Sequence, residues 1–217
     1  AMLRNLLSAT IILALSACAV TATYPPTAGK AVVTGNTPPL PQVMASALRY
    51  AQQRGNPNAV MVYNLPPDTL SHVHSFDLDM REVELLLFTH AHDDHLAEKE
   101  LQYLSWMFLP SGDTSNLRIA GSETVLNKIR QSIDTEQVPL TIEPALRPWE
   151  TRQIGDWSIT PVIPNHDPSQ ICFNHIIERE GKRLLYATDT GWYSESTWSF
   201  LKSTRLDAIV VEASKGP

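Results

Sequence analysis

The sequence predicts an α/β fold of the αββα sandwich type, with two sheets inside and helices outside. Short apolar runs of strand length alternate with segments of helical periodicity along residues 30–217. The chain has 217 residues, of which 43% are hydrophobic and 18% are charged, and this composition supports one sizeable core and argues against disorder. The sequence shows no internal repeat and no sign of a second folded domain.

The first part of this region alternates between predicted strands and helices. Residues 30–35 form an apolar run that ends at a glycine, and residues 58–63 form another, so both are predicted strands. Between them, residues 43–53 have helical spacing with no Gly or Pro. Asp68 is a suitable N-cap for a short helix that ends at His74. The apolar run at residues 83–89 predicts the next strand.

The second part begins with two helices and continues with short strands. Residues 98–108 have apolar side chains at helical spacing, and Ser122 is a good N-cap for a helix at residues 125–133. Strands are predicted at residues 140–142, 157–163, 171–178, 183–187 and 207–212. Residues 178–182 supply a hairpin turn, and residues 194–201 form the helix before the last strand.

The N-terminal segment has the features of an export signal. Met2–Asn5 is short and basic, and residues 6–17 are apolar but too few for an ordinary membrane-spanning helix. Leu15–Cys18 resembles a bacterial lipobox, a signal that is cleaved before a cysteine whose thiol is then lipidated. Residues 19–29, rich in Pro, Thr and Ala, would then tether the domain.

This interpretation divides the chain into three parts and gives it a location. Residues 1–18 are the signal or lipoprotein segment, residues 19–29 are the tether, and residues 30–217 are the folded domain, incomplete at its C-terminus. A lipidated Cys18 would anchor the protein to a membrane in the cell envelope or periplasm. The alternative is that residues 6–17 form a first strand or helix of the domain, in a cytoplasmic protein.

The most informative run of the chain is His90-Ala91-His92-Asp93-Asp94-His95, which directly follows the strand predicted at residues 83–89. Imidazole nitrogens and carboxylate oxygens are the ligands that zinc and similar borderline cations prefer. A strand that ends here can direct several of these side chains to one point. The alternative is a polar surface loop rich in His, but such a dense group is costly to hold together without a cation.

The His-x-His-x-Asp-His pattern of this run resembles the signature of the metallo-β-lactamase fold superfamily. The resemblance implies that His90 and His92 bind a first metal ion, and that Asp94 and His95 bind a second. Asp94 would also orient the nucleophilic water, which makes it the candidate catalytic residue. The expected cofactor is zinc, as one or two ions, and Mn²⁺, Fe²⁺ and Ni²⁺ are alternatives because His and Asp ligands accept them as well.

The resemblance also implies two later ligands, and both are present. His166 follows the apolar run of residues 157–163, and Asp189 follows that of residues 183–187, as the carboxylate expected to bridge the two ions. Residues 65–72 and 181–191 look like the branch of the superfamily that contains cyclic-phosphate phosphodiesterases and tRNase Z-like enzymes. The implied reaction is hydrolysis by a metal-activated water, without a covalent enzyme intermediate.

Two departures from the superfamily pattern affect the expected metal site. Asn64 stands where an Asp usually orients a ligand His; an amide can still accept a hydrogen bond from the imidazole, but it adds no negative charge, so metal affinity should fall. The pattern also ends in a last His, whereas no His follows His175 here. We therefore expect a C-terminally truncated domain, one firmly held ion, or impaired activity. An incomplete sheet would also favour oligomers.

Several other residues are weaker candidates for a site. His72, His74 and His175 are more simply explained as helix or strand residues than as ligands. Cys172 is expected to be a buried inert thiol, since it lies only six residues after His166. Among the five Trp residues, which are expected to lie mostly in the core, Trp192 follows Asp189 closely enough to line a cleft.

The sequence therefore predicts an enzyme, a metal-dependent hydrolase whose first candidate substrate is a phosphodiester. The alternatives are a β-lactam or lactone hydrolase, and a metal-binding protein with impaired or no turnover. The expected partner is a small-molecule substrate. General nucleic-acid binding is not expected, because the net charge is −6 and no Lys/Arg cluster stands out.

Overall fold

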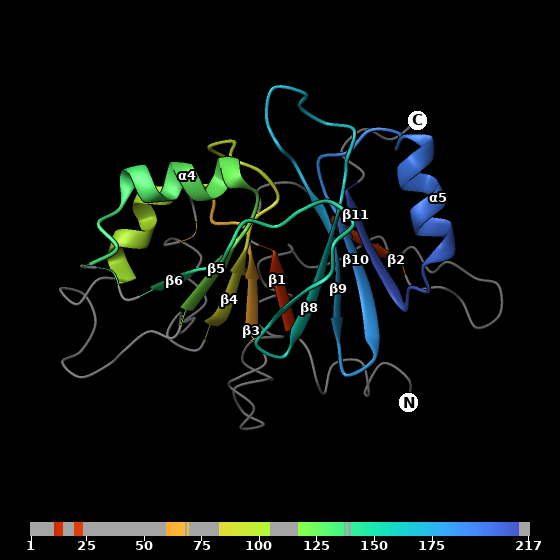
Figure 1. Cartoon of the computed structure of the whole chain (residues 1–217), viewed down its shortest axis with the longest axis horizontal. Coiled ribbons are helices and arrows are strands. Elements are labelled where there is room, and N and C mark those ends of the chain that lie inside the picture. Colours follow the sequence, from red (N-terminus) through yellow and green to blue (C-terminus); the bar gives the residue numbers. More distant parts are fainter. Residues whose placement is uncertain are drawn as a thin grey trace, which may run out of the picture. The chain divides into compact units, whose positions relative to one another are not determined.

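The computed structural model describes residues 11–14, 20–23, 60–67, 69, 83–104, 117–136, 138 and 140–212. The chain divides into two compact units, each built on one sheet (Figure 1). The first unit contains residues 1–17 and 41–145, and the second contains residues 18–40 and 146–217. The strand predicted at residues 30–35 and the helix predicted at residues 43–53 lie outside the described residues, as does nearly all of the short helix predicted at residues 68–74.

The first unit contains a five-stranded parallel sheet. Its strands, in sheet order, are β1 (Ile11–Ala14), β3 (Val60–Tyr63), β4 (Val83–Leu87), β5 (Leu117–Ala120) and β6 (Leu140–Ile142). β4 is almost entirely apolar, and Leu85, Leu86 and Leu87 are fully buried. A strand with consecutive buried apolar residues is typical of the interior of a parallel sheet. The strand that leads into the His run is therefore fixed in the core of its unit.

Two helices of the first unit follow β4 in sequence. η3 (Glu98–Leu104) is a 3₁₀ helix, and α4 (Glu123–Ser132) is an α-helix that buries Val125, Leu126 and Ile129. Ser122 is the N-cap of α4, as predicted, and its hydroxyl accepts a hydrogen bond from the Val125 N–H at 3.4 Å. α4 begins two residues earlier than its apolar spacing indicates, because the capping residue rather than the first apolar residue starts the helix.

The second unit contains a six-stranded mixed sheet. Its strands, in sheet order, are β2 (Val20–Thr23), β11 (Ala208–Glu212), β10 (Lys182–Ala187), β9 (Asn174–Arg179), β8 (Trp157–Val162) and β7 (Arg152–Ile154). β7 to β10 form an antiparallel meander. β11 is parallel to β10, and α5 (Glu195–Ser203) connects the two. Val162, Ile176, Leu185 and Leu201 pack together, so α5 covers a face of this sheet (Figure 1).

Outside the N-terminal segment, the structure differs from the sequence-based prediction in four elements. β5 and β7 were not predicted, and the helix expected at residues 98–108 is a shorter 3₁₀ helix where it is described. β9 begins at Asn174, three residues later than expected. β5 and β7 have only four and three residues, too few for a clear alternation of apolar and polar side chains.

Two short strands fall in the segments assigned to an export signal and a tether. β1 lies in the apolar run of residues 6–17 and pairs with β3, which is the placement expected if this run belongs to the domain. β2 lies at residues 20–23 and pairs with β11. The export signal and the lipidation of Cys18 stay predictions. Among the described helices, none has both the length and the apolar character needed to cross a membrane.

Candidate metal centre

The loop after β4 carries four of the six predicted ligands and is held at both ends by backbone hydrogen bonds. The Phe88 N–H donates to Ala120 O at 2.9 Å, and the Leu65 N–H donates to His95 O at 2.8 Å. Leu96 then forms a β-bridge with Leu65. The His run is therefore a short loop whose two ends are tied to the strands on either side of it.

Three imidazoles of this loop pack against one another. His90 and His95 are each 1% exposed, and the centroids of their rings lie 4.3 Å apart. His90 Nε2 lies 3.0 Å from His92 Nδ1. Asp94 is at the rim, 65% exposed, with Oδ2 at 3.5 Å from His95 Nε2. The structure thus brings the three predicted His ligands of this unit together, with the predicted carboxylate beside them.

The geometry of this group fits a divalent cation. Zinc binds imidazole nitrogen at about 2.0–2.1 Å in a tetrahedral arrangement, so two nitrogens on one ion lie roughly 3.3 Å apart. The 3.0 Å between His90 Nε2 and His92 Nδ1 is close to that spacing. The donor set is nitrogen and carboxylate oxygen without a thiolate, which suits zinc and the neighbouring borderline metals.

A buried hydrogen-bond network lies behind the imidazoles. The amide oxygen of Asn64 accepts from the Thr89 N–H at 3.0 Å and from the Thr89 hydroxyl at 3.1 Å. The Asn64 amide nitrogen lies 2.8 Å from His95 Nδ1, and Thr89 Oγ1 lies 2.9 Å from His90 Nδ1. Asn64 has a φ of 62°, in the left-handed region that Asn tolerates better than most residues. All four side chains are buried.

This network corrects the role expected for Asn64. We expected its amide to accept a hydrogen bond from a ligand imidazole. In the structure the amide oxygen faces Thr89 and the amide nitrogen faces His95, so Asn64 donates to the imidazole instead. The reason is that an amide has a single acceptor atom, and the Thr89 N–H and hydroxyl already use both of its lone pairs.

Lys128 of α4 fixes the tip of the loop, a role that the sequence analysis missed. Its ammonium donates to Ala91 O at 3.0 Å, to Asp93 Oδ1 at 2.6 Å and to Leu96 O at 3.5 Å. The hydrogen bond and the charge of Lys128 lower the pKa of the Asp93 carboxyl. Asp93 therefore pairs with the helix, and its neighbour Asp94 is the carboxylate that lies beside the imidazoles.

The two predicted ligands of the second unit lie on adjacent loops. His166 follows β8 and Asp189 follows β10, and both strands are antiparallel to β9, so the two loops leave the same edge of the sheet. The loops are joined by hydrogen bonds from Gly191 N–H to Asn165 O at 2.8 Å and from Asn165 N–H to Thr190 Oγ1 at 3.1 Å. Asp189 has a left-handed φ of 49°. The predicted order of strands thus places both ligands on neighbouring loops.

Buried polar side chains support the loop of Asp189 through hydrogen bonds. The Asn174 amide donates to Thr188 O at 2.8 Å, and the Tyr193 hydroxyl donates to the Asn174 amide oxygen at 2.5 Å. Burial raises the pKa of Tyr193 above its ordinary value, so the phenol remains a donor at neutral pH. The backbone just before Asp189 is therefore held by the side chain of Asn174, which Tyr193 fixes in turn.

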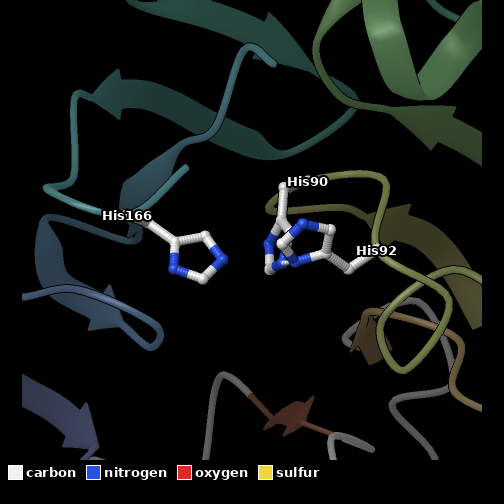
Figure 2. A group of neighbouring side chains, drawn as sticks. All are labelled: His90, His92 and His166. Atoms are coloured by element: carbon white, nitrogen blue, oxygen red, sulfur yellow. Dashed lines mark hydrogen bonds between the residues drawn. The ribbon is translucent and has the colours of Figure 1, made fainter. Parts of the chain in front are cut away.

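Figure 2 shows three of the predicted ligands as they lie in the two units. The rings of His90 and His92 lie close together on the loop after β4, and His166 is carried by the loop after β8. Within each unit the structure therefore brings the predicted ligands of that unit to one loop or to two adjoining loops. That the two sets bind one metal centre is a proposal, developed below.

The weaker candidates are placed away from a ligand role or lie outside the described residues. His175 is fully buried on β9, where desolvation lowers its pKa to about 3, so it is neutral at physiological pH. Cys172 is a buried thiol without a disulfide, and burial raises its pKa. Trp192 is 78% exposed and packs on the ring of Trp198. His72 and His74 are outside the described part of the chain.

Comparisons with known proteins agree with this arrangement. A family model described as Beta-lactamase superfamily domain matches residues 64–215. The metallo-β-lactamase fold protein YhfI from Bacillus subtilis is similar in structure, with a TM-score of 0.50 and 19% identity, over 64% of this chain and 55% of that one. A diphosphatase from the PhnP family gives a TM-score of 0.50 and 14% identity, over 65% of this chain and 52% of that one. No curated protein matches the chain.

The solved structures establish the fold of the chain, and the family model establishes its family. The chain spans about half the length of these solved structures, and at such low identity the likeness shows the fold alone. The family match covers most of the chain and includes both loops that carry the predicted ligands. The chain therefore belongs to the β-lactamase superfamily and has the metallo-β-lactamase fold.

Proposed function

We propose that this chain is a metal-dependent hydrolase that acts on a phosphodiester. The observation that carries the proposal is the packed pair of His90 and His92, whose ring nitrogens lie 3.0 Å apart on a tied loop, in a chain of the β-lactamase superfamily. The similar fold of a PhnP-family diphosphatase supports a substrate with a phosphoryl group. Superfamily membership supports hydrolysis as the type of reaction.

The proposed metal centre uses the ligands predicted from the sequence. His90, His92 and His166 would hold the first ion, and Asp94, His95 and Asp189 would hold a second. When bound, a zinc ion lowers the pKa of a coordinated water to near 7 and polarises a phosphoryl oxygen. Zinc suits the donor set best, and Mn²⁺, Fe²⁺ and Ni²⁺ remain alternatives.

The side chains around the centre prepare it for this chemistry. The Thr89 hydroxyl donates its proton to Asn64, so it accepts from His90 Nδ1–H and places the His90 lone pair on Nε2. The Asp94 carboxylate lies at the rim beside His95, where it would accept a hydrogen bond from the attacking water and so orient it. No side chain of the site would need to act as the nucleophile, because a metal-activated water would supply it.

The test is turnover of bis-p-nitrophenyl phosphate and of nitrocefin by the purified full chain, with and without added zinc. We expect zinc-dependent phosphodiester hydrolysis that chelation abolishes. The His92→Ala variant should lose at least about 100-fold, since it removes a ligand and not merely a neighbour of one. Asn127→Ala, an exposed change on α4 of the same unit, is the matched control and should keep full activity.

The remaining outcomes would replace the proposal. Turnover of nitrocefin alone would make the chain a lactam hydrolase. Zinc bound without either activity would favour a metal-binding protein that has lost turnover. Hydrolysis that persists in His92→Ala would show that the His run is not the catalytic centre.

Location and partners are proposed separately from the chemistry. We propose a small-molecule substrate and, if residues 1–18 act as a lipoprotein signal, a membrane anchor at Cys18 in the cell envelope. Radiolabelled palmitate incorporated by the wild type and lost in Cys18→Ser would support the anchor. Equal labelling of the two proteins would contradict it and favour the cytoplasmic alternative.

A further inference from the structure

We infer that Asn64 fixes the tautomers of His90 and His95 in opposite senses, so that the chain holds one metal ion firmly and a second only weakly. The inference deepens the proposed metal centre and rests on it. Its starting point is the network of four buried side chains, Asn64, Thr89, His90 and His95, all within one unit.

The orientation of the Asn64 amide is set by a backbone group. The Thr89 N–H can only donate, so the atom 3.0 Å away from it must be the amide oxygen. Turning the amide over would place two N–H donors opposite each other at a site where all groups are buried, and each would lose its acceptor. The amide nitrogen therefore faces His95.

This orientation decides where His95 carries its proton. The amide nitrogen of Asn64 can only donate, and it lies 2.8 Å from His95 Nδ1, so Nδ1 must hold the lone pair. A neutral His95 then carries its proton on Nε2, which lies 3.5 Å from the Asp94 carboxylate, a natural acceptor. A protonated Nε2 cannot bind a metal ion. Binding through Nε2 would require the proton to move to Nδ1. That N–H would then face the N–H of the Asn64 amide, so two donors would oppose each other.

The same network gives His90 the opposite tautomer. The Thr89 hydroxyl has one proton, which it donates to the Asn64 oxygen at 3.1 Å, so it must accept from His90 Nδ1–H at 2.9 Å. The lone pair of His90 is then on Nε2, 3.0 Å from His92 Nδ1, where the first ion is proposed. The first site is thus prepared for a metal ion, and the His95 side of the second site is not.

A carboxylate at position 64 would remove this conflict. Its two oxygens are both acceptors, so one can accept the Thr89 N–H while the other accepts His95 Nδ1–H, and His95 Nε2 becomes a ligand. Asn64 is thus a positioning residue that acts through His95. The change Asn64→Asp keeps the size of the side chain, and Asp also tolerates the left-handed backbone of this position.

The first arm of the test examines the wild-type chain, so it does not depend on a variant that folds. Long-range ¹H–¹⁵N NMR of the metal-free protein distinguishes the two tautomers of each neutral imidazole, and the signals of His95 are assigned by their loss in His95→Gln. We expect the Nε2–H form for His95 and the Nδ1–H form for His90. A His95 ring protonated on Nδ1 would overturn the inference, whatever the metal binding.

The second arm is a calorimetric zinc titration of three proteins: the wild type, Asn64→Asp and Asn127→Asp. Asn127→Asp adds the same charge on the exposed face of α4 and is the matched control. We expect one tight equivalent in all three, and a second equivalent that Asn64→Asp binds at least about 10-fold more tightly than the other two. Asn64→Asp should also shift the NMR signals of His95 to the Nδ1–H form.

The outcomes separate the inference from the proposed function. A second equivalent bound equally by the wild type and Asn64→Asp overturns the inference and leaves the proposed centre intact. Zinc bound by none of the three proteins overturns both the metal count and the proposed function.

Discussion

At the scale of single residues, the candidate site depends on which atom of each polar side chain faces its neighbour. His90, Thr89, Asn64 and His95 form one chain of hydrogen bonds in which each donor has a determined acceptor. One oxygen-to-nitrogen difference at residue 64 reverses the proton position on His95. The proton positions of the proposed ligands are therefore set by the residues behind them.

The burial of His175 predicts how the stability of the protein depends on pH. Desolvation lowers its pKa to about 3 from its ordinary 6.5, so between these values the unfolded chain binds more protons than the folded one. The free energy of unfolding should therefore fall as the pH drops from 6.5 towards 3, by up to about 1.4 kcal/mol per pH unit from this group. Urea unfolding at several pH values measures this slope.

The contribution of His175 is isolated by a variant that does not titrate. In His175→Gln the fall in stability with decreasing pH should be less steep than in the wild type, because other titrating groups are common to both proteins. Parallel pH profiles for the two proteins would show that His175 is not desolvated on β9.

At the scale of elements, α4 is more than a cover for the core of its unit. Its first turns bury Val125 and Leu126, and the next turn presents Lys128 to the loop of the His run. Lys128 donates to carbonyls at both ends of that loop, Ala91 and Leu96. The helix therefore transmits the rigidity of the core to the proposed ligands.

Removing this ammonium should loosen the loop. Lys128→Met keeps the aliphatic stem but removes the donors, and we expect the free energy of unfolding to fall by roughly 2 kcal/mol. Zinc affinity should fall roughly 10-fold, because the loop that orients the ligands loses its support. Urea unfolding and zinc titration measure the two effects.

Arg130→Met is the matched control for this change. Arg130 lies on the same helix but contacts only Glu123 and Asn127 of that helix, in exposed pairs, among the hydrogen bonds and ion pairs of the described residues. Its loss should cost no more than about 0.5 kcal/mol and leave zinc affinity unchanged. Equal effects of the two substitutions would mean that Lys128 does not support the site.

The elements that the sequence predicts well are those with a clear local signal. β4 is apolar except for Glu84, and α4 has both apolar spacing and a capping serine, so both are confirmed close to their expected bounds. β5 and β7 are short, and β7 is largely polar, so only pairing with neighbouring strands defines them. Tertiary pairing of this kind is not visible in a local pattern.

Some residues of the candidate site can be predicted from the sequence, and others cannot. The His run is contiguous, so its ligand-type residues are visible in the sequence, and the confirmed strand β4 places it at a strand end. The roles of Thr89 and Lys128 depend on contacts with residues 25 to 37 positions away, to Asn64 and to Ala91. A threonine after a strand and a lysine on a helix are too common to predict such contacts.

At the scale of the whole molecule, the family match and the proposed ligands cover the same stretch of chain. Residues 64–215 include the His run of the first unit and the loops of His166 and Asp189 in the second. Each unit thus supplies part of the proposed ligand set. The chain spans about half the length of the similar solved structures, so activity and substrate stay proposals for the whole protein.

The central proposal is that His90, His92 and His166 bind one divalent ion. Crystals of the zinc-loaded chain, measured on both sides of the zinc absorption edge, test it most directly. We predict a strong anomalous peak about 2.0–2.1 Å from His90 Nε2 and from His92 Nδ1, with His166 as a further ligand. No anomalous peak at His90 and His92, or a peak there without His166 in the coordination shell, would contradict the account.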